Sequence, residues 1–565
     1  MSEFVLALGT ALVTALLADL NYFETAVLVA LLFYSYRRTQ RYPQISKAFD
    51  KLARRRALAI PGVIAATLLG RLALLPCVSV PAPLVPDEFS HRLLGETLSI
   101  GRLTNPAHPL WRHFESIHII PQPSYASMYF PMQGIFLAVG FLLGHPWIGI
   151  WLSTGLMCGA ICWMMYTWLP PRWALLGGLL AVLRLGLLSY WMNSYWGGAH
   201  AALGGALVLG AIGRLRRRFD WISAAALGIG MSVLLLGRPL EGGVLCTAAL
   251  VYLTVQLKPL RVLRRAAPAL VVLTIAGGFL ALYCLRVTGS PTTVPYQINQ
   301  RLYGWPMTLI TYSPPGIHTE HPQLQQYYDW EIGEHNKLRY SFFSYTVERL
   351  GLLWRFYVGP LLSVALLGFW RVRRTRPLCW IAGLILALVM LEESGYPHYL
   401  APACSAVLVL LVQGLRVFRL YRPGSSPMGR TFVRHLPGLL VALVVLRAAG
   451  LPTLPVVQHK NYTSWCCTLP GHYDRESLEA RLRQAGSTHV ILVRYHEQQF
   501  STKEWVYNHP DIDRAAVIWA RDMGAQNAEL KARYPQRHFW LAEPDEMPLR
   551  VTDCQQTPQT CGLLP

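Results

Sequence analysis

The sequence contains few charged residues, and acidic residues are the scarcer kind. Only 14% of its 565 residues are charged, with 30 Asp and Glu against 51 Lys and Arg. A typical soluble domain contains about 25% charged residues, so this composition excludes an ordinary soluble protein. The hydrophobic share of 53% and the mean hydropathy of +0.31 agree. The composition therefore indicates a polytopic membrane protein.

Several common ligand-binding motifs are also missing. The sequence has no Walker A loop, no Gly-x-Gly-x-x-Gly opening a helix after a strand, no His-Glu-x-x-His and no Cys-x-x-Cys. Nucleotide-binding and structural-metal functions therefore have no support. The first basic residues follow the apolar segment from Phe4 to Tyr36 instead of preceding it, so we expect no cleavable signal peptide.

Long apolar stretches recur along the chain. They cover 57–76, 148–169, 173–191, 199–213, 221–237, 242–257, 266–285, 351–370, 378–391, 399–415 and 435–450. In lipid they must be helices, because each backbone polar group needs an internal partner. Asp19, Asn21 and Glu24 interrupt the segment 4–36, which is one span or a tight pair, and the short run 131–144 is re-entrant or interfacial. We expect an all-α fold with about 12 to 13 transmembrane helices.

Basic residues gather in short loops between these stretches. The clusters comprise Arg37, Arg38, Arg41, Lys47, Lys51 and Arg54 to Arg56; Arg214 and Arg216 to Arg218; Lys258, Arg261, Arg264 and Arg265; Arg371, Arg373, Arg374 and Arg376; and Arg416, Arg419, Arg422, Arg430 and Arg434. This distribution is typical of cytoplasmic loops. The net charge of +21 therefore indicates membrane orientation and not a nucleic-acid partner.

The opposite side of the membrane then receives every other polar motif. These motifs are Asp87-Glu88, 193–200 (NSYWGGAH), 238–241 (RPLE), the loop 286–348 and 392–399 (EESGYPHY). Loops that face one compartment can converge, so we expect a single extracytoplasmic site at the water–lipid interface. Paired carboxylates at a membrane boundary are costly, which indicates chemistry at Asp87-Glu88.

The last part of the chain has a different character. Residues 451–565 are less hydrophobic and predict a small extracytoplasmic α/β domain, after an N-terminal segment 1–56 and a transmembrane catalytic domain 57–450. We expect a helix over 474–485, buried strands over 488–494 and 538–541, and another α/β element over 513–520. Its four cysteines, Cys466, Cys467, Cys554 and Cys561, either form disulfides in an oxidising compartment or remain thiols.

The order of these features resembles the GT-C superfamily of membrane glycosyltransferases. The closest likeness is to the branch that contains protein O-mannosyltransferases and aminoarabinose transferases of lipid A. Asp87-Glu88 matches an Asp-Glu pair after the first core span, and an amphipathic stretch, 92–100, follows it. His398 to Pro402 (HYLAP) is similar to a Tyr-Leu-Leu-Pro-like element, and Arg238-Pro239 stands where many relatives carry Lys-Gly-Pro, with the glycine missing. The likeness covers roughly residues 57 to 450.

The resemblance implies sugar transfer from a polyprenyl-phosphate donor to a lipid, glycan or protein acceptor at the outer face of the cytoplasmic membrane. A carboxylate accepts the acceptor's proton in such chemistry; we assign this role to Asp87, with Glu88 orienting it, binding the acceptor or raising the pKa of Asp87. Guanidinium groups suit the donor phosphate, which predicts roles for Arg238 and Arg301, with His398 as a third candidate. The expected sugar or acceptor contacts are His91, Arg92, Tyr296, Gln297, Asn299, Gln300, Tyr303 and Tyr399.

Each assignment has a structural alternative. The alternative for Asp87 and Glu88 is to cap a helix that starts near Phe89. Arg238 has a potential partner in Glu241, and the alternative for Arg301 is an ordinary loop cation. The loop 193–200 offers no carboxylate, so we expect no metal and no other cofactor. Two other functions stay open: a flippase or transporter of a polyprenyl-linked sugar, and a polymerase or ligase of lipid-linked glycans.

Overall fold

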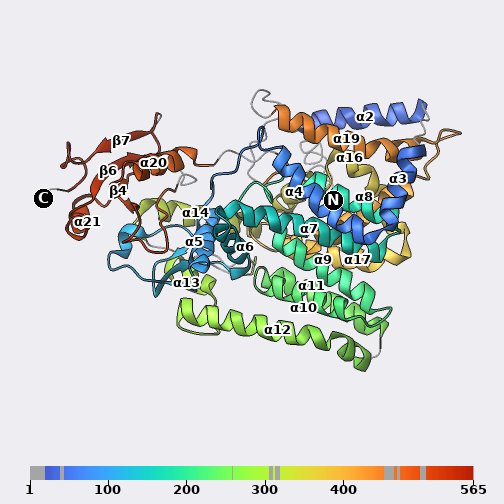
Figure 1. The fold of residues 1–565 in the computed structure, drawn as a ribbon, viewed down its shortest axis with the longest axis horizontal. Coiled ribbons are helices and arrows are strands. Elements are labelled where there is room, and N and C mark those ends of the chain that lie inside the picture. The colour runs from blue at the N-terminus through green and yellow to red at the C-terminus, as the bar shows by residue number, and fades with distance from the viewer. Residues whose placement is uncertain are drawn as a thin grey trace.

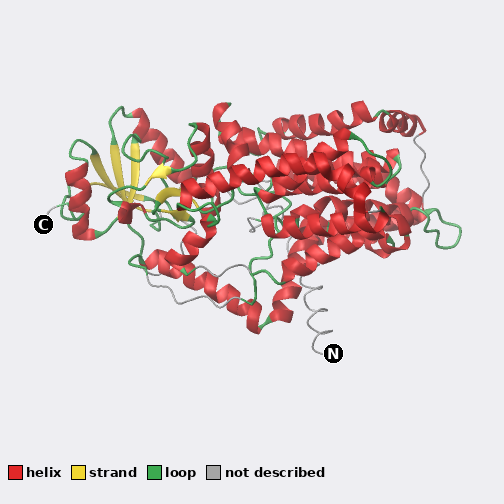
Figure 2. Ribbon diagram, turned by 90° about the horizontal axis from the view of Figure 1, so that it is seen from below, coloured by secondary structure: helices red, strands yellow, loops and turns green. Residues whose placement is uncertain are grey.

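The computed structural model describes residues 20–37, 43–257, 259–304, 309–311, 319–450, 463–466, 471–496, 504–546 and 548–563. The molecule is elongated, with a helical bundle at one end and a small β-sheet at the other (Figure 1). Nearly all of the bundle is helical, and the strands gather near the C-terminus (Figure 2).

Helices account for most of the chain up to residue 450. They are α2 (Leu20–Arg37), α3 (Pro43–Arg54), α4 (Arg56–Ala73), α5 (Pro86–Ser99), α6 (Pro131–Leu142), α7 (Pro146–Trp168), α8 (Pro171–Ala181), α9 (Ala199–Leu215), α10 (Trp221–Leu235), α11 (Pro239–Gln256), α12 (Pro259–Thr288), α13 (Pro295–Tyr303), α14 (Pro322–Tyr340), α15 (Phe342–Tyr357), α16 (Gly359–Leu362), α17 (Arg376–Met390), α18 (Cys404–Phe418) and α19 (Met428–Gly450).

Six of the described helices are long and apolar enough to cross a membrane: α4, α7, α11, the part of α12 from residue 264, α18 with the turn before it, and α19. Helices α6, α9 and α10 are apolar but shorter. The segments Phe342–Tyr357 and Gly359–Arg371 pass the test only together, and they are bent by 84°. A mostly helical membrane protein is therefore found as expected, while the larger number of spans stays a prediction.

Two expected spans are broken. The run 173–191 forms only α8, a π-helical turn at Val182–Gly186 and irregular turns, and the run 351–370 breaks at Gly359, where φ is +65°. Buried Arg184 explains both breaks. Its guanidinium donates to the carbonyls of Arg355 and Phe356, which have no helical partner where α15 ends.

The basic loops share one end of the bundle. Arg217, after α9, and Arg374, before α17, both donate to the carbonyl of Thr167 at 2.9 Å. Arg265, near the start of α12, donates to the carbonyl of Leu215. These contacts bring together three of the basic clusters, and the location of all five on the cytoplasmic side stays a prediction.

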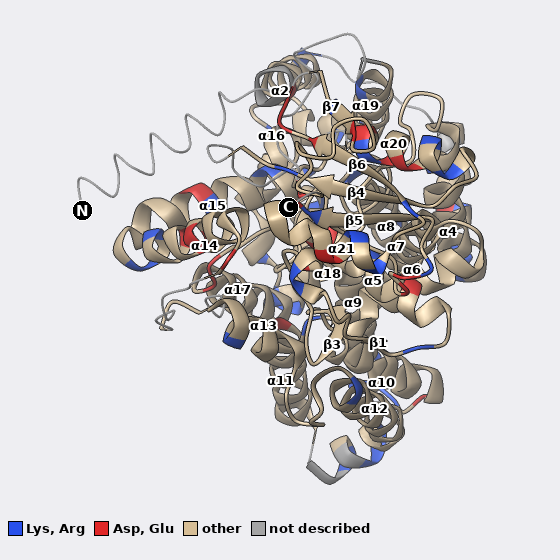
Figure 3. Cartoon of the chain, turned by 90° about the vertical axis from the view of Figure 1, so that its left-hand side faces the viewer, with Lys and Arg blue, Asp and Glu red and all other residues tan. Residues whose placement is uncertain are grey.

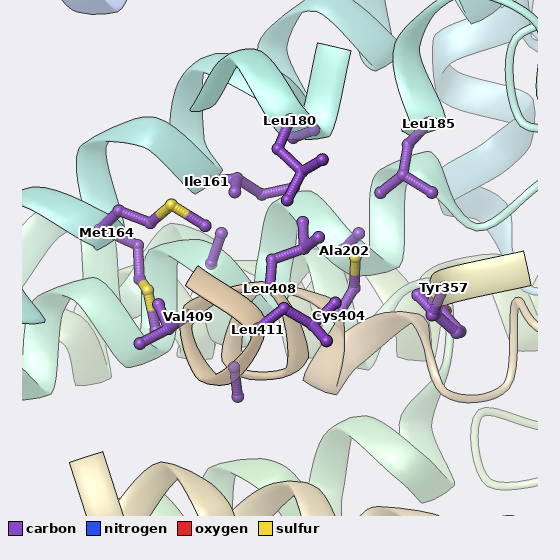
Figure 4. Packing of buried hydrophobic residues seen from close by; sticks show 14 of the residues in the cluster. Ile161, Met164, Leu180, Leu185, Ala202, Tyr357, Cys404, Leu408, Val409 and Leu411 are labelled. Carbon is purple, nitrogen blue, oxygen red and sulfur yellow. The ribbon is translucent and has the colours of Figure 1, made fainter. Parts of the chain in front are cut away.

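The bundle core lies where α7, α8, α9 and α18 meet (Figure 4). Small residues let these elements approach closely: a Cβ added to Gly205 of α9 would lie 1.8 Å from the carbonyl oxygen of Pro402, just before α18. Close backbone approach at small residues is a usual packing mode in lipid. This contact holds the 398–402 segment against α9.

The C-terminal part is an α/β domain. It contains α20 (Tyr473–Gln484), β4 (His489–Val493), β5 (Val517–Arg521), α21 (Asn527–Arg533), β6 (His538–Glu543) and β7 (Arg550–Asp553). The strand order is β5-β4-β6-β7, with β4 parallel to β5 and β6 and β7 antiparallel to β6. The expected elements are confirmed, whereas α21 and β7 were not predicted. Cys554 and Cys561 form a disulfide, Cys466 is also disulfide-bonded, and Cys467 lies outside the described residues.

This domain shares its hydrophobic core with α5 and the loop that follows it. That loop carries a small sheet of β1 (Asn105–Pro106), β3 (Ser124–Ser127) and β2 (Ile119–Ile120). The rings of Phe89 on α5 and Tyr507 stack with centroids 4.2 Å apart, and Arg521 on β5 donates to the carbonyl of Glu115 at 2.7 Å. The residues before and after position 451 therefore contribute to one common hydrophobic core.

Candidate active site

Glu88 belongs to the framework of the N-terminus of α5. Its carboxylate accepts the backbone N–H groups of Leu84 (2.6 Å), Val85 (3.1 Å) and Tyr195 (2.7 Å). The first two bonds cap the helix, and the third ties it to the segment before α9. Burial raises the pKa of Glu88 to about 7 despite these donors. The capping alternative is thus found for Glu88, whose side chain is buried and fully engaged.

Asp87 is placed differently, although it is the next residue in the chain. One carboxylate oxygen accepts a hydrogen bond from the hydroxyl of Tyr129 at 2.5 Å, and the other lies 3.7 Å from Nδ1 of His118. The side chain is 22% exposed. Asp87 is therefore the carboxylate of the pair that a reactant can reach.

Aromatic rings border Asp87. The ring of His91 stacks on Tyr129 with centroids 4.3 Å apart, and Tyr296 of α13 meets Tyr129 edge-on at 5.5 Å. Among the described residues, Nδ1 of His91 has no hydrogen-bond partner. Burial, followed by the charges of His200 and Arg238, holds the pKa of His91 well below its usual range. Stacking rings and an unpaired nitrogen are suited to a polar ring-shaped ligand.

Arg238 stands immediately before α11. Its guanidinium lies 3.4 Å from the Glu241 carboxylate and 4.3 Å from the centre of the Tyr399 ring. The predicted pairing with Glu241 is therefore present. The Arg238 side chain is still 21% exposed, and one carboxylate uses only part of the five donors of a guanidinium. Arg238 can therefore bind a second anion.

An apolar groove begins beside Arg238. It has a volume of about 790 Å³ and lies between α11 and α17, from Pro239 and Leu240 past Val251 to Trp380 and Leu384. Several of its side chains face outward, with Trp380 80% exposed. A groove of this composition is suited to an alkyl or isoprenoid chain.

A second buried arginine was not predicted. Arg349 of α15 lies over the Tyr345 ring at 4.1 Å and donates to the carbonyl of Glu392. Its Nε and Nη2 atoms have no hydrogen-bond partner among the described residues, and neither does the Glu392 carboxylate. The only signal in the sequence is an arginine directly before the apolar run 351–370, and that signal is common in cytoplasmic and extracytoplasmic loops alike.

The structure corrects several predicted site residues on α13, because the sequence 296–303 forms a helix and not an open loop. Arg301 is exposed, and Gln297 accepts the N–H of Val294 as a helix cap at 3.1 Å. Asn299 and Tyr303 are buried toward Tyr328 and Glu115. Tyr296, at the start of the helix, contacts the Tyr129 ring beside Asp87.

Two further predicted residues, Arg92 and His398, have structural partners. Arg92 pairs with Glu476 of α20 at 2.9 Å and so fixes the C-terminal domain. His398 is buried and shares a hydrogen bond with the Tyr190 hydroxyl through Nδ1 at 2.9 Å, which leaves it a poorer phosphate ligand than Arg238. Gln300 is half-buried, and no contact places it beside Asp87.

In the part of the chain that the structure describes, no three His, Cys, Asp or Glu side chains are grouped to hold a metal ion. The expectation of a metal-independent site stays a prediction.

Comparisons with known proteins were made at three levels. No family model matches the sequence, and no curated protein matches it. Among solved structures, the chain is similar to ArnT from Cupriavidus metallidurans bound to undecaprenyl phosphate, with 14% identity, a TM-score of 0.46, and 85% of this chain and 92% of that chain covered. It is also similar to the oligosaccharyltransferase AglB from Archaeoglobus fulgidus in complex with an inhibitory peptide and a dolichol-phosphate, with 11% identity, a TM-score of 0.43 and coverages of 86% and 69%.

Both proteins belong to the GT-C superfamily that the sequence motifs resemble. A further structure of the archaeal enzyme, tethered to an acceptor peptide, has 11% identity and a TM-score of 0.42, with 86% of this chain and 68% of that chain covered. These likenesses concern the fold alone. The chemistry that follows is argued from the side chains of this chain.

Proposed function

We propose that this chain is a membrane glycosyltransferase that moves a sugar from a polyprenyl-phosphate donor to an acceptor hydroxyl or amine. The observation that supports the proposal is the position of Arg238. It immediately precedes Pro239 and Leu240 of the apolar groove, its guanidinium lies over the Tyr399 ring, and its charge lowers the pKa of His91, which stacks on Tyr129 beside Asp87. A polyprenyl-phosphate sugar has an apolar chain, an anionic group and a polar ring in that order. The groove, Arg238 and the Asp87 site offer matching environments in the same order.

The reaction needs a base at the acceptor and a cation at the leaving group. The acceptor oxygen attacks the anomeric carbon, its proton passes to Asp87, and the bond to the phosphate oxygen breaks with its electron pair remaining on the phosphate. A positioned carboxylate contributes typically about 10²- to 10⁴-fold. Arg238 stabilises the phosphate as its charge grows, and the unpaired guanidinium atoms of Arg349 supply a second positive charge near Tyr399.

We propose that the sugar lies beside His91 and Tyr296, which both contact the Tyr129 ring, and Tyr399, which contacts Arg238. Their rings are suited to stacking on a sugar face, and Nδ1 of His91 is available for a hydroxyl group. We further propose that the basic end of the bundle faces the cytoplasm and that the site opens on the outer side of the inner membrane, as the charge distribution predicts. The acceptor is a lipid, glycan or protein in that compartment.

The transporter alternative predicts charged groups inside the spans. Such a group exists: Glu24 of α2 pairs with Arg447 of α19 at 2.9 Å, and both side chains are 2% exposed. The Trp465 ring, however, lies against both Arg184 and Arg447, with guanidinium carbons 4.2 and 4.3 Å from its centre. The charged side chains in this cluster are buried against one another and against Trp465. The cluster is therefore better explained as a contact that stabilises the packing of α2 against α19.

Substitution of Asp87 tests the proposed reaction. Asp87→Asn preserves shape and removes the base, so we expect transfer to fall by about 10²- to 10⁴-fold while donor binding is kept. The measurement uses the radiolabelled polyprenyl-linked sugar fraction extracted from a strain that lacks this chain, with vesicles as the acceptor source. Asp50→Asn is the matched control, because Asp50 pairs with Arg172 at the basic end. Transfer by Asp87→Asn at the wild-type rate would show that the base is misassigned.

A further inference from the structure

A line of hydrogen-bonded side chains leads from Asp87 away from the site. The Tyr129 hydroxyl lies 2.5 Å from the Asp87 carboxylate and 2.9 Å from Nδ1 of His118. Nε2 of His118 lies 3.0 Å from the Tyr327 hydroxyl, which lies 2.7 Å from the Glu331 carboxylate. All the contacts lie within hydrogen-bonding distance. The sugar and phosphate chemistry described above uses only the first residue of this line.

The line continues from Glu331 to the protein surface. The Glu331 and Glu393 carboxyl groups share a hydrogen bond, and burial together with that neighbour holds the pKa of Glu393 well above its usual range. The hydroxyl of Tyr345 contacts both the backbone carbonyl of Glu393 (3.2 Å) and the carboxylate of Glu334 (2.9 Å). The Glu334 side chain is 20% exposed. Helices α14 and α15, which carry these groups, reach the outside of the molecule (Figure 3).

A proton count shows what this array can do. The four hydrogen bonds from Asp87 to Glu331 need four protons, whereas two tyrosines and one neutral imidazole supply three. The fourth proton completes the array equally well on Asp87 or on Glu331, with every bond reversed between the two states. When the proton is on the imidazole, both nitrogens of His118 donate. The array therefore lacks one proton only while both carboxylates are ionised and the imidazole is neutral.

The intermediate groups have the protonation behaviour that such an array requires. Burial and the nearby Asp87 charge hold the pKa of Tyr129 well above its usual range, and burial and Glu331 do the same for Tyr327. Burial lowers the pKa of His118, and the Asp87 and Glu331 charges oppose that shift. The tyrosines thus keep their protons, and the imidazole rests neutral between two carboxylates.

The backbone at His118 is held in an unusual conformation that places the imidazole in this line. Its φ is +63°, the only positive value among the described residues other than glycine. The carbonyl of His118 accepts the Ser90 hydroxyl at 2.7 Å and the N–H of Met128 at 3.2 Å. Non-glycine residues adopt positive φ rarely, and such positions cluster at functional sites. A histidine that only filled space would not need this conformation.

We propose that the array from Asp87 through Tyr129, His118 and Tyr327 to Glu331 is a proton relay that carries the acceptor's proton out of the active site. This inference rests on the proposed transferase function. When Asp87 has taken the proton, its hydroxyl gives a proton to Tyr129, Tyr129 to Nδ1 of His118, Nε2 of His118 to Tyr327, and Tyr327 to Glu331. Asp87 is then ionised again, and Glu331, which shares a hydrogen bond with the Glu393 carboxyl group, holds the proton. Tyr129, His118, Tyr327 and Glu331 act through Asp87 and are positioning residues.

Tyr327→Phe removes one oxygen from the middle of the relay. We expect kcat to fall by about tenfold, part of the contribution of general base catalysis, with the donor KM unchanged because no substrate contact is lost. The wild-type chain should show a solvent deuterium isotope effect on kcat whose dependence on deuterium content is curved, since several protons move together, and Tyr327→Phe should lose that curvature. Tyr125→Phe is the matched control: it removes a buried hydroxyl that donates to the carbonyl of Asn508, outside the relay.

His118→Gly provides a second test, in which added imidazole distinguishes loss of the relay from loss of packing. Glycine adopts positive φ without strain, and added imidazole can occupy the vacated space. Restoration of kcat by imidazole would support the relay, and failure of imidazole to restore it in a variant with the wild-type unfolding temperature would overturn it. If Tyr327→Phe keeps the wild-type kcat and isotope effect while Asp87→Asn is inactive, the relay alone is wrong. If Asp87→Asn is active, the proposed reaction itself fails.

Discussion

At the scale of single residues, helix geometry separates two carboxylates that the sequence presents as a pair. Successive residues on a helix point about 100° apart, so Glu88 turns toward the backbone of its own helix terminus while Asp87 faces Tyr129. Both carboxylates of the motif lie in the first turn of α5. The motif gave no means of dividing the roles, because the division depends on Tyr195 and Tyr129, which come from distant segments.

The two arginines predicted to bind phosphate, Arg238 and Arg301, also lie in different environments. Arg238→Gln removes the guanidinium beside the groove, so we expect kcat/KM for the donor to fall by about 10²- to 10³-fold, the usual effect of losing one donor to developing charge. Arg301→Gln removes an exposed side chain and should change kcat/KM by less than about twofold. Initial rates over a range of donor concentrations distinguish them. Equal losses in both variants would show that the exposed position contacts the donor.

At the scale of elements, the apolar runs predicted helices well where they were uninterrupted. Strand β4 falls within its expected range, and α7, α12, α18 and β6 overlap theirs but extend beyond them. The failures at 173–191 and 351–370 have one cause, because Arg184 bonds to carbonyls at the end of α15. The helix α13 was missed because its polar sequence, YQINQRLY, was interpreted as a loop of ligands when it is an amphipathic turn of helix.

The N-terminus of α5 should make stability depend on pH. The folded pKa of Glu88 is about 7 against an ordinary 4.5, so the folded chain binds the proton more tightly than the unfolded chain between these values. The contribution of Glu88 to stability is therefore fully present below pH 4.5 and is lost as pH rises toward 7. Thermal unfolding in detergent should show a higher midpoint at pH 5 than at pH 7.5 from this group.

Glu88→Gln removes the titrating carboxyl group and with it the difference in unfolding midpoint between pH 5 and pH 7.5. It also introduces an amide N–H₂ group that faces backbone N–H donors. We expect it to destabilise the chain by about 1 to 3 kcal/mol, the usual effect of leaving a buried donor unsatisfied. Glu320→Gln is the control, since Glu320 is 60% exposed and pairs with Arg112 at the surface. A midpoint of Glu88→Gln that still falls with pH by the wild-type amount would assign the dependence to another group.

At the scale of the whole molecule, charge separates the two ends. The contacts of Arg217, Arg265 and Arg374 gather the basic loops, while Asp87, Arg238 and the sheet lie toward the other end. The sequence predicted this arrangement because the spans alternate in direction. It did not predict that the C-terminal domain and α5 share one core, since the aromatic contact of Phe89 with Tyr507 joins segments that are far apart in the chain.

Orientation in the membrane follows from this separation. A reporter active only outside the cytoplasm should be active when fused after residue 563 and inactive when fused after residue 218, because basic loops are retained inside. As the matched control, the same reporter is fused after residue 218 in a chain in which Arg216, Arg217 and Arg218 are replaced by Glu. This loop should be held in the cytoplasm less strongly. Activity in the opposite pattern would place the Asp87 site in the cytoplasm, away from the proposed acceptors.

The groove between α11 and α17 presents Trp380 and Val251 on the outside of the bundle. A ligand held there can arrive sideways from the surrounding lipid without passing through water. The quantity that governs its occupancy is then its mole fraction among neighbouring lipids, a two-dimensional concentration. Enzyme and donor encounter each other at a rate set by lateral diffusion, and the composition of the bilayer becomes a kinetic variable in its own right.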